Sequence, residues 1–183
     1  MKSFRQLIKL RRMYSHNLLN RDRWMAQQAR LLQPGAAVLD GGAGSCPCRR
    51  RFFHCSCKTR DFTALSGGQL RNGAYGQIDY VSDARKIPVP DQTFDAVVCT
   101  GMPEHVPEPV EVIKESSRIL KPGGKAIIAA PLGSGIHQEP CHFYGGFTPW
   151  WYEKFLSGAG FADIVVEPER RFTVGYHVTA VKR

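Results

Sequence analysis

The strongest indication of a ligand-binding site in this sequence is an aspartate followed by three glycines within four positions. Asp40 precedes Gly41, Gly42 and Gly44, and the apolar residues 37–39 come immediately before it. Glycines let the backbone turn sharply and let a ligand approach the main chain, where a Cβ would collide. An acid at this position would repel a phosphate, so the loop favours a cationic or amine-bearing ligand.

A second acid lies where a ribose contact is expected. Asp61 follows Asp40 by 21 residues, at the end of the second expected strand, and an acid about 20 residues after such a loop commonly meets a ribose hydroxyl pair. Two carboxylate oxygens can accept both hydroxyl protons. The alternative is a turn aspartate or a helix cap for the residues from Phe62 onward.

Four further blocks follow in a fixed order: IDYVSDA at 78–84, IPVPD at 87–91, FDAVVC at 94–99 and LKPGGK at 120–125. With the glycine loop, these blocks resemble the class I methyltransferases that use S-adenosylmethionine, and within them the small type 11 branch. The resemblance runs from about Val38 to Phe161. The amino and sulfonium groups of that cofactor are positive, which agrees with the acid before the glycines.

The resemblance implies a set of cofactor-binding residues. In this sequence they are Asp40, Gly41, Gly42, Gly44, Asp61, Asp83, Ala84 and Thr100. Asp83 would accept from the adenine amino group, and the Ala84 amide would face the ring. Three positions depart from the family pattern: Gly101 replaces a glutamate, Pro103 replaces an aliphatic residue, and Cys46 occupies the third glycine position of the loop.

Candidate acid and base groups lie in the loop that follows the fifth expected strand. His137, Glu139, His142 and Tyr144 alternate there with aromatic residues and glycines, as in an acceptor pocket or lid. We expect His142 to act as the base that removes a proton from the acceptor. The alternative is that His142 and the nearby aromatic residues form a packing cluster. Glu104 and His105 match the family, where such a histidine is more often structural than catalytic.

Six cysteines are present, and four form two C-x-C pairs: Cys46 with Cys48, and Cys55 with Cys57. Structural zinc sites usually space their pairs C-x₂₋₄-C. We therefore expect reduced structural thiols and no metal, while a metal site at these pairs remains the alternative.

The elements that position these residues follow from hydrophobic periodicity and breakers. Helices are expected over 2–13, 19–32 and 107–120, with another opening at Thr148-Pro149 and ending at Gly158 or Gly160. Strands are expected at 36–40, 54–60, 77–82, 94–100, 124–131, 162–167 and 172–181. Only a short turn separates the last two strands, so they should pair antiparallel.

The expected fold is therefore α/β: a Rossmann-like sheet of seven strands, mainly parallel with one antiparallel strand, and helices on both faces. The carboxyl ends of parallel strands share one rim, where open sheets of this kind bind ligands. Asp40, Asp61, Asp83 and Thr100 should emerge there.

The net charge of +9 is concentrated near the front of the chain, where eight Lys or Arg residues within positions 1–30 face the single acid Asp22. We expect residues 1–33 to be a basic helical segment packing on the core, and 34–183 to be the methyltransferase domain. A basic segment can also hold nucleic acid or an anionic membrane surface, or serve as an organelle transit peptide. A solvated helix face is the simplest interpretation.

The leading hypothesis is in-line methyl transfer from S-adenosylmethionine to a small-molecule or saccharide-like acceptor, with little acid or base machinery. The alternatives are a non-catalytic or degenerate cofactor-binding module and an RNA-directed protein. Nucleic acid is a possible but not a favoured partner. Because no apolar run is long enough for a transmembrane helix and the start lacks a secretory signal, we expect a cytoplasmic protein.

Overall fold

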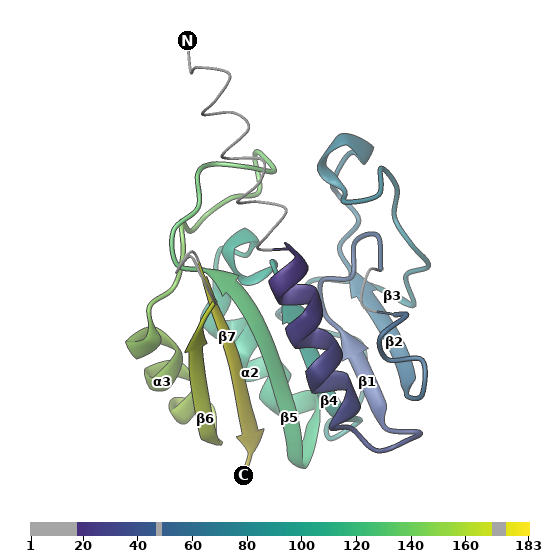
Figure 1. The fold of residues 1–183 in the computed structure, drawn as a ribbon, viewed down its shortest axis with the longest axis vertical. Coiled ribbons are helices and arrows are strands. Elements are labelled where there is room, and N and C mark those ends of the chain that lie inside the picture. The colour runs from purple at the N-terminus through teal and green to yellow at the C-terminus, as the bar shows by residue number, and fades with distance from the viewer. Residues whose placement is uncertain (1–17, 47–48, 170–174) are drawn as a thin grey trace.

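The computed structural model describes residues 18–46, 49–169 and 175–183 and forms a seven-stranded sheet in the order β3-β2-β1-β4-β5-β7-β6 (Figure 1). The strands are β1 (Ala37–Asp40), β2 (Ser56–Asp61), β3 (Tyr80–Val81), β4 (Phe94–Thr100), β5 (Leu120–Pro131), β6 (Phe161–Pro168) and β7 (Gly175–Lys182). The α/β, Rossmann-like fold expected from the sequence is thereby confirmed.

Strand direction also agrees with the expectation. The pairs β1–β2, β1–β4, β2–β3 and β4–β5 are parallel, whereas β7 pairs antiparallel with both β5 and β6. The reversed strand β7 thus lies one position in from the sheet edge. The short β6–β7 connection, which leaves no room for a crossover helix, accounts for the antiparallel pairing of these two strands.

Two apolar cores cover the two faces of the sheet, and β4 contributes alternately to both. Val97 packs in the core beneath α2 (Pro109–Ile119) and α3 (Pro149–Gly158), whereas Val98 packs in the core beneath a helix over residues 18–30. Successive strand side chains point to opposite faces, so a strand covered on both sides is apolar throughout. In Figure 1 the purple helix of residues 18–30 crosses the face opposite α2.

The helix α2 is held at its C-terminal end by a partly buried ion pair. Arg118 Nη2 donates to Glu115 Oε1 at 2.7 Å, and the same oxygen accepts from the Ile87 backbone N–H at 2.6 Å. The helix ends at Ile119, one residue before the expected boundary, because Pro122 disfavours the helical conformation at Lys121. Residues from Leu120 onward therefore join β5 earlier than periodicity predicts.

Several expected elements are shorter or lie outside the described residues. The strand expected at 77–82 is reduced to Tyr80–Val81, and the helix expected at 19–32 covers 18–30. In the described parts of the β1–β2 and β2–β3 connections, the helical structure is limited to the short 3₁₀ helix η1 (Gly67–Gln69). The helix expected at 2–13 lies outside the described residues. None of the described helices is long and apolar enough to cross a membrane.

The helix α3 begins as the sequence indicates, with Thr148 as its N-cap and Pro149 in the first turn. The Thr148 hydroxyl accepts from the Trp151 backbone N–H at 3.3 Å. This bond satisfies one of the unpaired amides at the helix start.

We expect Thr148→Ala to lower the free energy of unfolding by about 1 kcal/mol, because the capping acceptor is lost. Thr148→Ser keeps the hydroxyl and should stay close to the original stability. Urea denaturation of the three proteins measures the difference. Equal loss in the Ser and Ala variants would contradict a capping role.

Candidate cofactor and acceptor pocket

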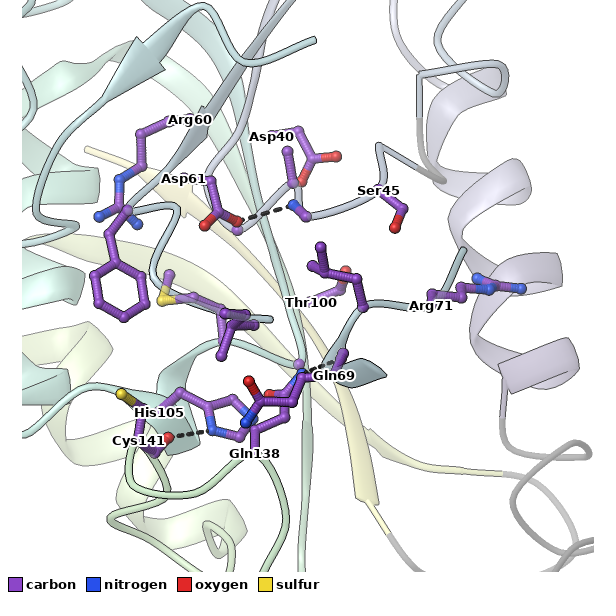
Figure 2. A pocket seen from close by; sticks show the side chains of 18 of the residues that line it. Asp40, Ser45, Arg60, Asp61, Gln69, Arg71, Thr100, His105, Gln138 and Cys141 are labelled. Atoms are coloured by element: carbon purple, nitrogen blue, oxygen red, sulfur yellow. Dashed lines mark hydrogen bonds between the residues drawn. The ribbon is translucent and has the colours of Figure 1, made fainter. Parts of the chain in front are cut away.

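A pocket opens at the carboxyl ends of β1, β2 and β4 (Figure 2). Its floor is formed by the strand ends and the glycine loop, and its walls come from the loops after β2, β4 and β5 and from Arg21 of the helix at 18–30. The polar residues that line it are Arg21, Asp40, Ser45, Arg60, Asp61, Gln69, Arg71, Thr100, His105, Gln138 and Cys141. This rim is the place where parallel open sheets bind ligands.

The glycine loop is built against β4 and the residues after it. The Gly41 N–H donates to Val98 O at 2.7 Å, which continues the sheet into the loop. A Cβ on Gly42 would lie 2.7 Å from Met102 Cβ, so that position is closed to larger residues. Gly44 has φ +50°, a conformation that favours glycine.

Asp61 fixes the far end of the glycine loop. Its Oδ2 accepts from the Gly44 N–H at 2.8 Å, drawn as a dashed line in Figure 2, and its Oδ1 accepts from the Thr63 N–H at 3.0 Å. Each carboxylate oxygen keeps further lone-pair capacity for a ligand hydroxyl. Asp40 lies beside it with 1% exposure, so two carboxylates lie at the floor of the pocket, next to the Arg60 guanidinium.

Arg60 is a pocket residue that the sequence analysis missed. It is buried at the end of β2, where Nη1 donates to Gly41 O at 3.0 Å and Nη2 donates to Ser82 O. Its guanidinium therefore joins the end of β1 to the segment after β3. No motif distinguishes this arginine in the sequence, because its role depends on three strand ends meeting in space.

Two loops from distant parts of the chain meet over the pocket. Gln69 Nε2 donates to Glu139 O at 2.9 Å, and Gln138 Nε2 donates to Gln69 O at 3.0 Å. At the other side Arg71 forms a salt bridge to Asp22 with 2.6 Å between Nη2 and Oδ2. The segment after β2 is thus joined both to the loop after β5 and to the helix at 18–30.

The structure brings together five of the eight predicted cofactor-binding residues. Those that line the pocket are Asp40, Gly42, Gly44, Asp61 and Thr100. Gly41 is a buried residue of the glycine loop that does not line the pocket, and Ala84 is part of the apolar core. Asp83 lies outside the lining and forms a 2.5 Å salt bridge with Arg85, which lowers the pKa of the Asp83 carboxyl.

The predicted base His142 lies next to the pocket and not in its lining. Its Nε2 is 3.3 Å from Ser134 Oγ, and its ring centroid is 5.5 Å from that of His105, which does line the pocket. Burial lowers the pKa of the His142 imidazole. A neutral imidazole can accept a proton.

The segment after β4 buries a glutamate beside that histidine. Glu104 is 3% exposed, and burial raises its pKa to about 7. Burial also lowers the pKa of His105 to about 4, so its ring is neutral near neutral pH. Gly101, which stands where the family has a glutamate, is approached by Arg21 Nη1 at 3.4 Å from the position a Cβ would take.

The described cysteines around the glycine loop are half-buried free thiols. Cys46 adopts φ +54° at the third glycine position, and its thiol donates to Gln77 O at 3.4 Å. Burial raises the pKa of Cys55 and Cys57, which disfavours their thiolates. Cys48 lies outside the described residues, so the alternative of a metal at the C-x-C pairs stays untested.

Comparison with known proteins finds matches to methyltransferases over part of the chain. Residues 41–128 match a family model described as a methyltransferase domain. The chain is 44% identical over 69 residues to a ubiquinone biosynthesis O-methyltransferase of Xanthomonas oryzae pv. oryzae, covering 37% of this chain and 27% of that protein. It is 30% identical over 145 residues to 2-methyl-6-phytyl-1,4-hydroquinone methyltransferase 1, chloroplastic, of Oryza sativa subsp. japonica, covering 69% and 39%. The chain thus spans less than half the length of these relatives.

Among solved structures, the fold is similar to that of the 1,6-didemethyltoxoflavin-N1-methyltransferase of Burkholderia thailandensis. The TM-score is 0.64 at 20% identity, and the match covers 88% of this chain and 78% of that one. The strand order, the glycine loop after β1 and the family match agree. These findings agree with the resemblance to the type 11 branch of the class I methyltransferases that the sequence blocks show.

Proposed function

We propose that this protein transfers a methyl group from S-adenosylmethionine to a small-molecule acceptor. The observation that carries the proposal is the acidic pocket floor, where Asp40 and Asp61 flank the glycine loop at the carboxyl ends of the parallel strands. Two carboxylates suit a ligand with ammonium and sulfonium charges and a ribose diol. The named relatives, which act on quinone-type compounds, support an acceptor of small size.

Methyl transfer requires little acid–base catalysis by the protein. The sulfonium already activates the methyl carbon, so the main tasks are to hold donor and acceptor in line at near-attack distance and to exclude water. The loops joined through Gln69 and Gln138 are placed to cover the pocket. If the acceptor is a hydroxyl or an amine, His142 would remove its proton.

The finer assignments belong to the same proposal. We take Asp61 as the ribose contact and Asp83 with Ala84 as the adenine contacts, as the family resemblance implies. Residues 34–183 would form the catalytic domain, and the segment 1–33 would pack on it through the helix at 18–30, whose Trp24 and Met25 are buried against the sheet. A saccharide-like acceptor and a cytoplasmic location also remain proposals.

Asp61→Asn should weaken S-adenosylmethionine binding at least tenfold, because the amide cannot accept from the Gly44 and Thr63 N–H groups and the ribose together. Isothermal titration calorimetry measures the affinity. Asp163→Asn is the matched control: this residue is exposed in β6 at φ +48°, a conformation asparagine accepts. Undetectable binding by the folded original protein would refute the proposed cofactor.

Gly42→Ala should abolish measurable cofactor binding and lower the melting temperature, because its Cβ would overlap Met102. Gly133→Ala introduces the same methyl group at an exposed position with open space around it, and should change neither quantity. Differential scanning fluorimetry with and without S-adenosylhomocysteine reports both. Equal behaviour of the two variants would argue against a ligand at this loop.

His142→Asn should reduce turnover of a hydroxyl or amine acceptor about a hundredfold and leave S-adenosylmethionine affinity unchanged, since a positioned base contributes roughly 10²–10⁴-fold. The measurement is release of S-adenosylhomocysteine with a panel of phenolic, amine and saccharide acceptors. A protein that binds the cofactor and methylates none of these classes would fit a non-catalytic cofactor-binding module. Full turnover by the variant would exclude His142 as the base.

A further inference from the structure

A glutamate and two histidines from two different loops converge beside the pocket. Glu104 and His105 belong to the 3₁₀ helix η2 (Pro103–His105), and His137 belongs to the loop after β5. Each can offer one ligand atom, and these three atoms lie within 4.8 Å of one another. Of the described residues, they form a set with the composition and spacing of a metal site.

Both histidines are held in a tautomer that leaves the Nε2 lone pair free for a metal ion. His105 Nδ1 is 2.6 Å from Cys141 O, and His137 Nδ1 is 2.9 Å from Gly135 O. A carbonyl oxygen only accepts, so each Nδ1 carries the proton and each Nε2 keeps its lone pair. Metal-binding histidines are commonly oriented in this way, by donation from the second ring nitrogen to a carbonyl or carboxylate.

Glu104 supplies the negative charge. Its side chain is buried, and its Oε2 makes no hydrogen bond to any described residue. Its Oε1 lies 3.9 Å from His105 Nε2. A buried carboxyl oxygen without a partner is costly, and a coordinated cation would satisfy it.

Three hydrogen bonds hold the two loops together. The N–H groups of Phe143 and Tyr144 donate to Glu104 O at 3.0 and 3.2 Å, and the Tyr144 hydroxyl donates to Pro107 O at 2.8 Å. These bonds fasten the loop after β5 to the segment that carries Glu104. The three ligands are therefore brought together by the fold, although His137 itself is exposed.

We propose that Glu104, His105 and His137 bind a divalent transition-metal ion of the zinc class. Two imidazoles and one carboxylate are a donor set that Zn²⁺ takes in open sites, where a fourth position is left for water or a ligand. An ion centred among atoms no more than 4.8 Å apart lies at most about 2.8 Å from each, and side-chain shifts of under about 1 Å reach the usual 2.0–2.1 Å.

This site differs from both metal expectations drawn from the sequence, which were no metal or a thiol site at the C-x-C pairs. His105 also lines the pocket, so an ion held here would adjoin the space proposed for the acceptor. The inference goes beyond the proposed methyl transfer and does not depend on it. It requires only the geometry of the two loops.

Cobalt titration of untagged, chelator-stripped protein tests the site. Co²⁺ reports its ligands through visible absorption, and cysteine ligation adds an intense near-ultraviolet charge-transfer band. We expect one equivalent to bind with visible bands and without that thiolate band, and Zn²⁺ to displace it. Absence of saturable binding, or a thiolate spectrum, would overturn the proposal.

Three variants identify the ligands. His137→Asn should weaken Co²⁺ and Zn²⁺ binding at least tenfold, and because His137 is exposed the substitution should leave the fold intact. Glu104→Gln keeps the buried shape and should weaken binding similarly. His142→Asn is the matched control, since this neighbour lies outside the three-residue set, and its metal affinity should change less than threefold. Unchanged affinity in His137→Asn, or an equal loss in His142→Asn, would refute this ligand set.

A variant that weakens cofactor binding should not weaken metal binding. Asp61→Asn, which disturbs the glycine loop, should leave Co²⁺ binding unchanged, because Asp61 is not among the three ligands. Loss of metal binding in this variant would show that the cluster depends on the loop, contrary to the independence argued above.

Discussion

The pocket depends on the bond between the Asp61 carboxylate and the Gly44 amide. In related folds a helix often follows the first strand and holds the glycine loop by its N-terminus. Here the described residues between β1 and β2 form turns, so the loop lacks that support. Asp61 replaces it by joining the end of β2 to the loop at 2.8 Å. The glycine conformation is thus fixed by a strand-end side chain, and the acid also faces the ligand space.

The positive charge of Arg60 offsets the repulsion between the Asp40 and Asp61 carboxylates. Asp40 and Asp61 place two carboxylates close together in a partly buried floor, which is unfavourable without compensation. The adjacent guanidinium contributes a positive charge while its N–H groups are taken up by Gly41 O and Ser82 O. Its donors are directed to the backbone and leave the carboxylate oxygens accessible. The floor can therefore stay acidic toward a cationic ligand and still be stable.

The sequence predicted those parts of the structure that are local. The apolar runs of β4 and β5 indicate strands buried on both faces, and Thr148 with Pro149 indicates a helix start; both features arise from neighbouring residues. The length of β3 was overestimated, because only Tyr80 and Val81 pair with β2. Strand pairing is not a local property of the sequence. The positions of Asp40, Asp61 and Thr100 on one rim followed from the general direction of parallel strands.

The contacts between loops were not predicted from the sequence. Gln69 and Gln138 are 69 positions apart, and polar loop residues of this kind carry no periodic signal that would pair them. The same holds for His105 and His137, which the sequence places in separate loops and the backbone bonds to Glu104 O bring together. A fold with one open rim gathers such loops over the strand ends. The contacts specific to this chain thus lie where sequence patterns are least informative, in the loops over the strand ends.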